Sequence, residues 1–80
     1  MTDEQIKEIA FEPMTEAWKV IRMTQNLTQN DDEGWQKYVE AHKEFCKKRN
    51  SKFNHYLGLA IMEAVEEIKN INMGAEKSEI

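Results

Sequence analysis

The most apolar segment of the chain extends from residue 56 to residue 65 and contains a single charged residue, Glu63. At 100° per residue, the apolar side chains in and around this segment fall on two opposite sides of a helix. One side carries Phe53, Leu57, Ala60, Ala64, Ile68 and Ile71, and the far side carries Leu59, Met62 and Val65. Because a helix that is apolar on two sides needs neighbours on both, the pattern predicts a bundle or self-association.

A first helix is predicted over about residues 3–28, with Thr2 or Asp3 as its cap. Pro13 lies inside this segment and cannot donate to the Ile9 carbonyl, so we expect a kink or a break there. Apolar side chains recur at helical spacing on one face, namely Ile6, Ile9, Ala10, Met14, Ala17 and Ile21, with Phe11 and Trp18 beside them.

A polar stretch from Asn26 to Gly34 predicts a loop, because Asn, Asp and Gly favour turns. Apolar spacing then predicts a second helix over residues 34–50 and a third over residues 52–72, with Ser51 as a cap. The second helix has one apolar face, formed by Tyr38, Val39, His42, Phe45 and Cys46.

These helices define an all-α fold, a small bundle of two or three helices in one domain spanning residues 1–80. Two architectures remain open at Asn50, where no Gly or Pro enforces a stop. Either the chain turns there and forms a compact three-helix domain, or the last two helices merge into one long helix, about Trp35 to Ile71, that dimerisation completes. We expect residues 1–2 and 75–80 to fray.

The composition of the chain limits the cellular compartments in which this domain is expected. The chain has 80 residues, a net charge of −4 and a single cysteine, Cys46, so an internal disulfide framework is excluded. The first residues are acidic and polar, unlike a signal peptide, and no apolar run approaches the ~20 residues of a membrane span. We therefore expect a cytoplasmic protein without membrane attachment.

One basic patch interrupts the acidic background. It consists of Lys43, Lys47, Lys48, Arg49 and Lys52, with Glu44 as the only acid in the same ten residues. Such a patch can contact phosphates, so a nucleic-acid-binding regulator is the alternative function. The helix that follows the patch offers mostly apolar side chains, whereas a helix that reads DNA bases needs polar ones. This favours the interpretation of the basic patch as the solvated end of a helix.

Candidate chemistry is sparse. His42 and Cys46 stand four residues apart and His55 follows, but zinc sites favour four closely spaced ligands, so we expect a buried structural histidine and no metal. Glu63-Ala64-Val65-Glu66 resembles one half of the paired carboxylates that hold magnesium in dimeric all-α nucleotide pyrophosphohydrolases, and the second half is missing. A metal-dependent nucleotide hydrolase is thus the third hypothesis, and no catalytic residue or cofactor is assigned.

The favoured function is binding to another protein without catalysis, as an adaptor, inhibitor or regulatory subunit. We also expect the protein to be a homodimer. The predicted seam consists of Leu59, Met62 and Val65 around a flat spot at Gly58. In the competing prediction Phe11 and Trp18 fold over Leu59 and Met62, and a monomer results with none of these side chains exposed.

Overall fold

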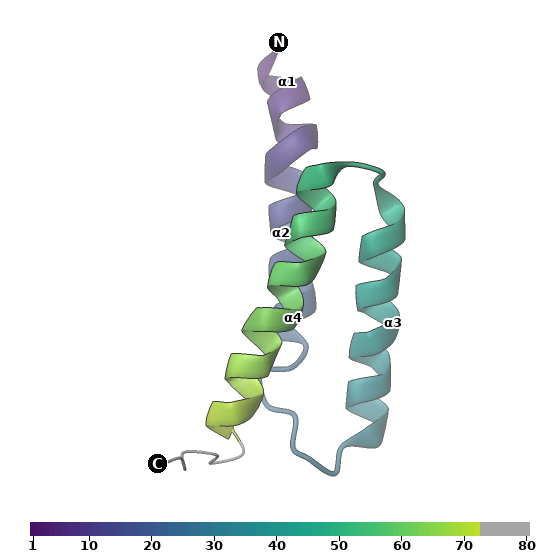
Figure 1. Cartoon of the computed structure of the whole chain (residues 1–80), viewed down its shortest axis with the longest axis vertical. Coiled ribbons are helices and arrows are strands. Elements are labelled where there is room, and N and C mark those ends of the chain that lie inside the picture. Colours follow the sequence, from purple (N-terminus) through teal and green to yellow (C-terminus); the bar gives the residue numbers. More distant parts are fainter. Residues whose placement is uncertain (73–80) are drawn as a thin grey trace.

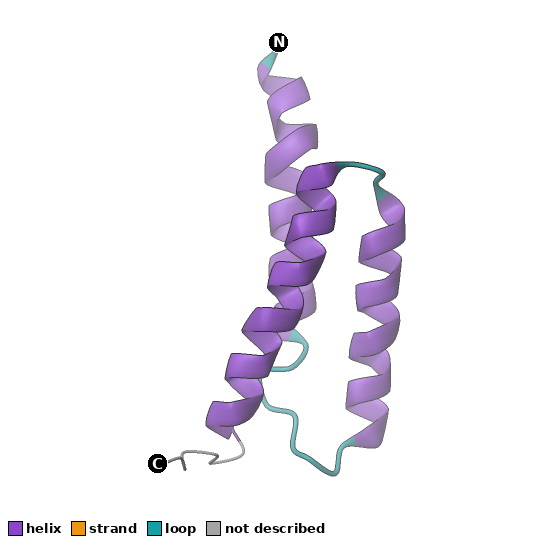
Figure 2. Cartoon of the chain, viewed as in Figure 1, coloured by secondary structure: helices purple, strands orange, loops and turns teal. Residues whose placement is uncertain are grey.

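The computed structural model describes residues 1–72, which form three helical stretches joined by two loops (Figure 1). Within this part of the chain there are helices and loops and no strands (Figure 2). The elements are α1 (Asp3–Ile6), η1 (Lys7–Phe11), α2 (Glu12–Arg22), α3 (Asp32–Lys48) and α4 (Lys52–Asn72). The predicted all-α bundle is confirmed in its three-helix form, in which α2 and α4 run in one direction and α3 in the other (Figure 1).

The first helical stretch begins with a complete cap. Thr2 Oγ1 accepts from the Gln5 N–H at 3.2 Å, and Gln5 Oε1 accepts from the Thr2 N–H at 2.7 Å. This capping box satisfies two N–H groups that a helix start otherwise leaves free. Thr2, which we expected to fray, is therefore held by its own side chain, whereas the expected fraying of 75–80 lies outside the described residues.

A π-helical turn, η1, lies directly before Pro13, where the sequence predicts a kink or a break. The Glu12 N–H donates to the Lys7 carbonyl, five residues earlier. Pro13 has no N–H for the Ile9 carbonyl and its ring crowds the preceding turn, and the wider π-turn accommodates both effects. The helix consequently continues through the proline without a break (Figure 1).

The first helix ends at Arg22, earlier than the expected boundary at residue 28. The buried Thr24 explains the difference. Its hydroxyl donates to the Ile21 carbonyl at 2.8 Å, and its N–H donates to the same carbonyl at 3.1 Å. These three-residue bonds replace the helical ones and turn the chain away.

The loop is tied to the start of α3. Asp31 Oδ1 accepts from the Gly34 N–H at 3.0 Å, so α3 begins at Asp32, two residues earlier than expected. Trp35 Nε1 donates to the Thr28 carbonyl at 2.9 Å. Gly34 leaves room for the Leu27 side chain, which a Cβ would overlap.

A short connection separates α3 from α4, so the merged long helix is wrong. Arg49 has extended backbone angles, φ −132° and ψ 136°, which stop α3 at Lys48. The Asn54 N–H donates to Ser51 Oγ at 3.1 Å, as expected of a capping serine. Asn54 Nδ2 then donates to the Phe45 carbonyl at 3.0 Å, in the last turn of α3 where carbonyls lack helical partners.

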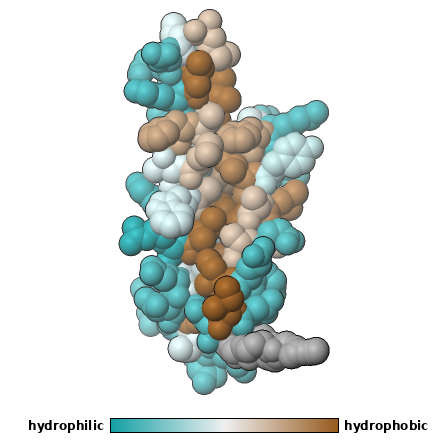
Figure 3. Space-filling view, turned by 90° about the vertical axis from the view of Figure 1, so that its left-hand side faces the viewer, coloured by the Kyte–Doolittle hydropathy of each residue, from teal (hydrophilic) through white to brown (hydrophobic). Residues whose placement is uncertain are grey.

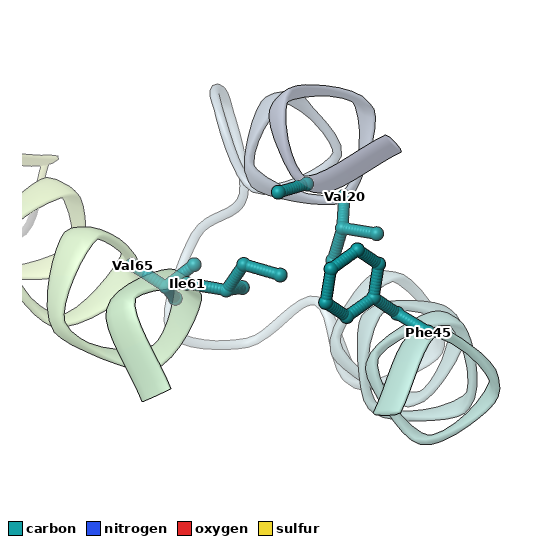
Figure 4. Close-up of a cluster of buried hydrophobic side chains, with 5 residues drawn as sticks. Val20, Phe45, Ile61 and Val65 are labelled. Carbon is teal, nitrogen blue, oxygen red and sulfur yellow. The ribbon is translucent and has the colours of Figure 1, made fainter. Parts of the chain in front are cut away.

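The hydrophobic core is small and lies between all three helical stretches. Val20 of α2, Phe45 of α3, and Ile61 and Val65 of α4 point toward a common centre, and Ala17 completes the cluster (Figure 4). Burial of a side chain of this kind stabilises the fold by about 1.5–3 kcal/mol. Five such residues leave many other apolar side chains of the chain outside the core.

The buried face of α4 differs from the predicted stripe by about one residue. Asn54, Gly58, Ile61 and Val65 are buried, whereas Phe53 of the expected stripe is exposed. Hydrogen bonds between α3 and α4 determine which face of α4 is buried. Besides the bond from Asn54, His42 Nε2 donates to the Gly58 carbonyl at 2.9 Å. Part of the apolar stripe of α4 is therefore left facing solvent.

Candidate interaction surface

The side of the α2 and α4 pair that faces away from α3 carries a band of apolar side chains (Figure 3). We call this band the α2/α4 face. The face has two hollows. The upper hollow lies along α1, η1 and α2 and is lined by Ile6, Ala10, Phe11 and Met14. The lower hollow lies between α2 and α4 and is lined by Trp18, Ile21 and Ile68. Its further members on α4 share the side of Ile68 at helical spacing, namely Phe53, Leu57, Ala60 and Ala64.

The large side chains of this face are well exposed. Phe11 is 63% exposed, Trp18 58% and Phe53 38%, and Ile6 and Met14 lie between these values. Side chains of this size present roughly 150–250 Å² when free, so at their exposed fractions these five together offer on the order of 500 Å². A patch of that extent is at the upper end of what monomeric proteins expose and is typical of an interaction site.

The two edges of the α2/α4 face differ in charge. On the α2 edge, the Arg22 guanidinium lies 5.9 Å from the centre of the Trp18 ring, and Lys7 borders the upper hollow. On the α4 edge, Glu63 follows Ala60 by three residues and Glu67 follows Ala64 by three, and both are exposed. Glu12 lines the same hollow as Lys7, and Lys7 Nζ lies 3.9 Å from Glu4 Oε1, so the cation that the α2 edge offers is Arg22, whereas the α4 edge is anionic.

The predicted seam residues are divided by the structure. Val65 is 5% exposed and Gly58 is buried, because both belong to the face of α4 that packs inside the chain. Leu59 and Met62 are 49% and 52% exposed. Their positions on α4 are far around the helix from Phe53 and Ala60, so they do not belong to the α2/α4 face.

The competing prediction, in which Phe11 and Trp18 fold over Leu59 and Met62, is wrong. All four side chains are about half exposed or more. Trp18 lies beside Ile68 at the opposite side of α4, since the turn after α2 places that helix against the Ile61 face. No sequence pattern distinguishes these two placements, because both bring apolar side chains together.

The basic patch is partly engaged in ion pairs with α2. Arg49 Nη1 and Nη2 donate to the two Glu16 carboxylate oxygens at 2.9 and 2.8 Å, and Lys48 Nζ donates to Glu16 Oε2 at 2.9 Å. Arg49 Nη2 also lies 4.0 Å from Glu12 Oε1. Lys43, Lys47, Lys48 and Lys52 are exposed, and Lys48 is the one of these four that also pairs with Glu16. The patch available to phosphates is therefore smaller than the sequence indicates.

These ion pairs shift the ionisation of both partners. The hydrogen bonds from Arg49 lower the pKa of the Glu16 carboxyl to about 2, and Lys48 adds to the effect against the opposing effect of burial. The same hydrogen bonds, which the Glu16 carboxylate accepts, raise the pKa of Arg49. A partly buried bidentate pair of this kind links the end of α3 to α2. Glu16 was not assigned a role from the sequence, since the residues that need it follow more than thirty positions later.

His42 lies in the α3–α4 contact, half-buried, and its Nε2 donates to the Gly58 carbonyl. Cys46 Sγ is 3.7 Å from the same ring nitrogen, and the thiol is free and exposed. His55 is exposed on another helix. The pair thus acts as a contact between helices, with Tyr38 beside it, and burial raises the pKa of the Tyr38 phenol.

Among residues 1–72, no three side chains of His, Cys, Asp or Glu come together as metal ligands. Glu63 and Glu66 are both exposed on α4. None of the helices described combines the length and the apolar content needed to cross a bilayer. No protein family, no curated protein and no solved structure was found to match the chain.

Proposed function

We propose that the protein acts by binding another protein molecule through the α2/α4 face, as an adaptor, inhibitor or regulatory subunit rather than as a catalyst. The observation that carries this proposal is the exposure of Phe11, Met14 and Trp18 along the first helical stretch and of Phe53 on α4. Aromatic and methionine side chains are enriched in protein interfaces. Exposed together in water, they favour association because burial removes apolar surface from solvent.

The arrangement of charge around this face supports the same function. A specific interface has an apolar centre and a polar rim, and the rim fixes orientation and partner choice. Here the centre is the aromatic and aliphatic band, and the rim is formed by Lys7, Glu12 and Arg22 on one edge and by Glu63 and Glu67 on the other. The face thus has both parts of an interface.

The proposed location is the cytoplasm. The only cysteine of the chain, Cys46, is a free and exposed thiol, which is typical of proteins kept in a reducing compartment. Thiol labelling of the protein taken directly from its native cells tests this location. Complete labelling of Cys46 is expected, and an oxidised thiol would contradict it.

A site-specific photo-cross-linker tests the function. The probe residue replaces Trp18 on the α2/α4 face in one variant and Lys37, exposed on α3, in a control variant. In native cells, irradiation of the Trp18 variant should give one or a few defined protein adducts, and the Lys37 variant should give none of them. Equal adduct patterns from the two positions would show that the face is not a binding site.

A further inference from the structure

The charges on the two edges of the α2/α4 face indicate its occupant, and this inference rests on the proposed function of that face. The α2 edge carries Arg22 and the α4 edge carries Glu67, both exposed. A surface with one cationic and one anionic edge is complementary to a copy of itself when the cationic edge of each molecule meets the anionic edge of the other.

The two charges also stand at the same height. Asn72 Nδ2 donates to the Gln25 carbonyl at 2.9 Å, which places the end of α4 level with the turn after α2. Ile68 lines the same hollow as Arg22 and Gln25, so Glu67, one residue before Ile68, lies near the level of Arg22. A partner turned about an axis along the helices would therefore bring its Glu67 opposite Arg22.

We propose that the partner on the α2/α4 face is a second copy of this chain, parallel to the first and related to it by a two-fold axis along the helices. In this dimer α2 of each copy packs against α4 of the other, and the Arg22–Glu67 pair forms twice. An axis across the helices would instead place α2 against α2 in opposite directions. Arg22 of each copy would then face α2 of the other, and the Arg22–Glu67 pair could not form.

The N-terminal elements α1 and η1 support the parallel arrangement. They contain no buried residue, although Ile6 and Phe11 are large and apolar. They lie at the same end of the molecule as the start of α4 (Figure 1). α1 extends beyond the start of α4 (Figure 1), so in the parallel dimer it is Phe11 of η1 that meets the beginning of α4 of the second copy, where Phe53 is exposed.

The available area is close to what such a dimer needs. A stable interface buries about 800 Å² on each partner. The five large side chains of the face offer on the order of 500 Å² at their exposed fractions. Leu57, Ala60 and Ile68 add to this area, which places the dimer toward the small end of stable interfaces.

Sedimentation equilibrium of the full chain at micromolar concentration is the first test. The proposal requires a species of twice the 9.5 kDa chain mass. Trp18→Glu should raise the dissociation constant of the dimer at least hundredfold, because it replaces the largest exposed aromatic side chain of the face by a charge. The matched control, Leu59→Glu with Met62→Lys on the other side of α4, should leave the dissociation constant within threefold. Circular dichroism checks that each variant keeps its helicity, which is expected since these side chains are about half exposed.

Exchange of the two charges tests the parallel arrangement itself. Arg22→Glu alone and Glu67→Arg alone should each weaken the dimer about tenfold, because each variant faces like charges at both pairs. An equimolar mixture of the two variants should restore wild-type affinity, since both pairs of the mixed dimer are then of opposite charge. Failure of the mixture to recover affinity would overturn the parallel arrangement.

Two other outcomes separate this inference from the proposed function. A wild-type chain that sediments as a 9.5 kDa monomer overturns the dimer, and cross-links from the Trp18 position to a different protein would still support the proposed function. A dimer that the Leu59 and Met62 variant dissociates, while Trp18→Glu does not, places the seam beside α3 and overturns the inference.

Discussion

Arg49 and Glu16 stand 33 residues apart in the sequence and form two parallel hydrogen bonds of 2.9 and 2.8 Å. The guanidinium comes from the residue that ends α3, and the carboxylate comes from the middle of α2. The planar fork of Arg matches the two oxygens of a carboxylate, which gives the contact a defined geometry. Part of a cluster that resembles a phosphate-binding patch in the sequence therefore holds the bundle together.

Glu16→Gln is expected to destabilise the fold by about 1–2 kcal/mol at neutral pH. The ion pair lowers the pKa of the Glu16 carboxyl well below its ordinary value. The full shift would correspond to a larger loss of unfolding free energy, which we reduce because solvent screens this partly exposed group. Urea unfolding of the two proteins measures the difference. Glu44→Gln is the control, since Glu44 forms no ion pair within residues 1–72, and its midpoint should match the wild type.

The contribution of Glu16 should depend on pH in one direction. A carboxyl whose pKa is lowered by folding stabilises the folded state above its unfolded value of 4.5, and the stabilisation disappears as the pH falls toward about 2. The gap in unfolding free energy between wild type and Glu16→Gln should thus be constant from pH 7 to about pH 5 and then close. A gap that persists unchanged at the acid end would contradict this origin of the stability.

The remaining basic residues should be dispensable for folding. Lys43, Lys47 and Lys52 are exposed, so replacing all three by Gln should leave the melting temperature within about 2 °C of wild type. Arg49→Gln should lower it clearly, because Glu16 then loses its bidentate partner. A filter-binding assay with the triple variant also tests the nucleic-acid alternative, which predicts salt-dependent binding by wild type and its loss in the variant.

Helix positions were largely predictable, because each helix has its own local causes. Ser51 caps α4 and Asp31 caps α3, and apolar spacing between the caps indicates helix over each segment. The bounds of α4 agree with the prediction, whereas α2 ends early because of the Thr24 hydroxyl, whose bond to Ile21 competes with the helix.

The face that α4 buries was not predictable from hydropathy. The buried positions include Asn54 and Gly58, while Phe53 stays outside. Contacts with residues more than a few positions away decide this choice, among them Asn54 with Phe45 and His42 with Gly58. A pattern of apolar positions carries no information on such pairs, and for this reason Gly58 and Val65, which the sequence places in the seam, lie inside the chain.

Asn54→Asp should be among the most destabilising single changes, by about 3 kcal/mol or more. Asn54 is fully buried, its Nδ2 donates to the Phe45 carbonyl, and its Oδ1 has no hydrogen-bond partner within residues 1–72. The aspartate would lose the donor and bury a charge, which outweighs the gain of up to about 1 kcal/mol for an anion near a helix start. Asn54→Ala should cost about 1–3 kcal/mol. Asn70→Asp, exposed on the same helix, is the control, and chemical denaturation that ranks it with Asn54→Asp would contradict the assignment.

Gly58 and Cys46 should be energetically coupled across the α3–α4 contact. A Cβ on Gly58 would lie 2.8 Å from Cys46 Sγ, closer than two such atoms approach, so the thiol or the helix must shift. In an exposed helix interior Ala is about 1 kcal/mol more favourable than Gly. We expect Gly58→Ala to destabilise the wild type by about 1 kcal/mol, because the shift disturbs the bond between His42 and the Gly58 carbonyl.

In a Cys46→Ala background the same change should stabilise the protein by about 0.5–1 kcal/mol, since the obstructing sulfur is gone and the helix propensity of alanine is left. Urea unfolding of the four proteins gives the coupling as a double-mutant cycle. Asn70→Ala compared with Asn70→Gly, at an exposed position of the same helix, supplies the intrinsic difference between the two residues. Effects of Gly58→Ala that agree within about 0.3 kcal/mol in both backgrounds would show that α3 does not approach α4 as closely as the Cys46 contact requires.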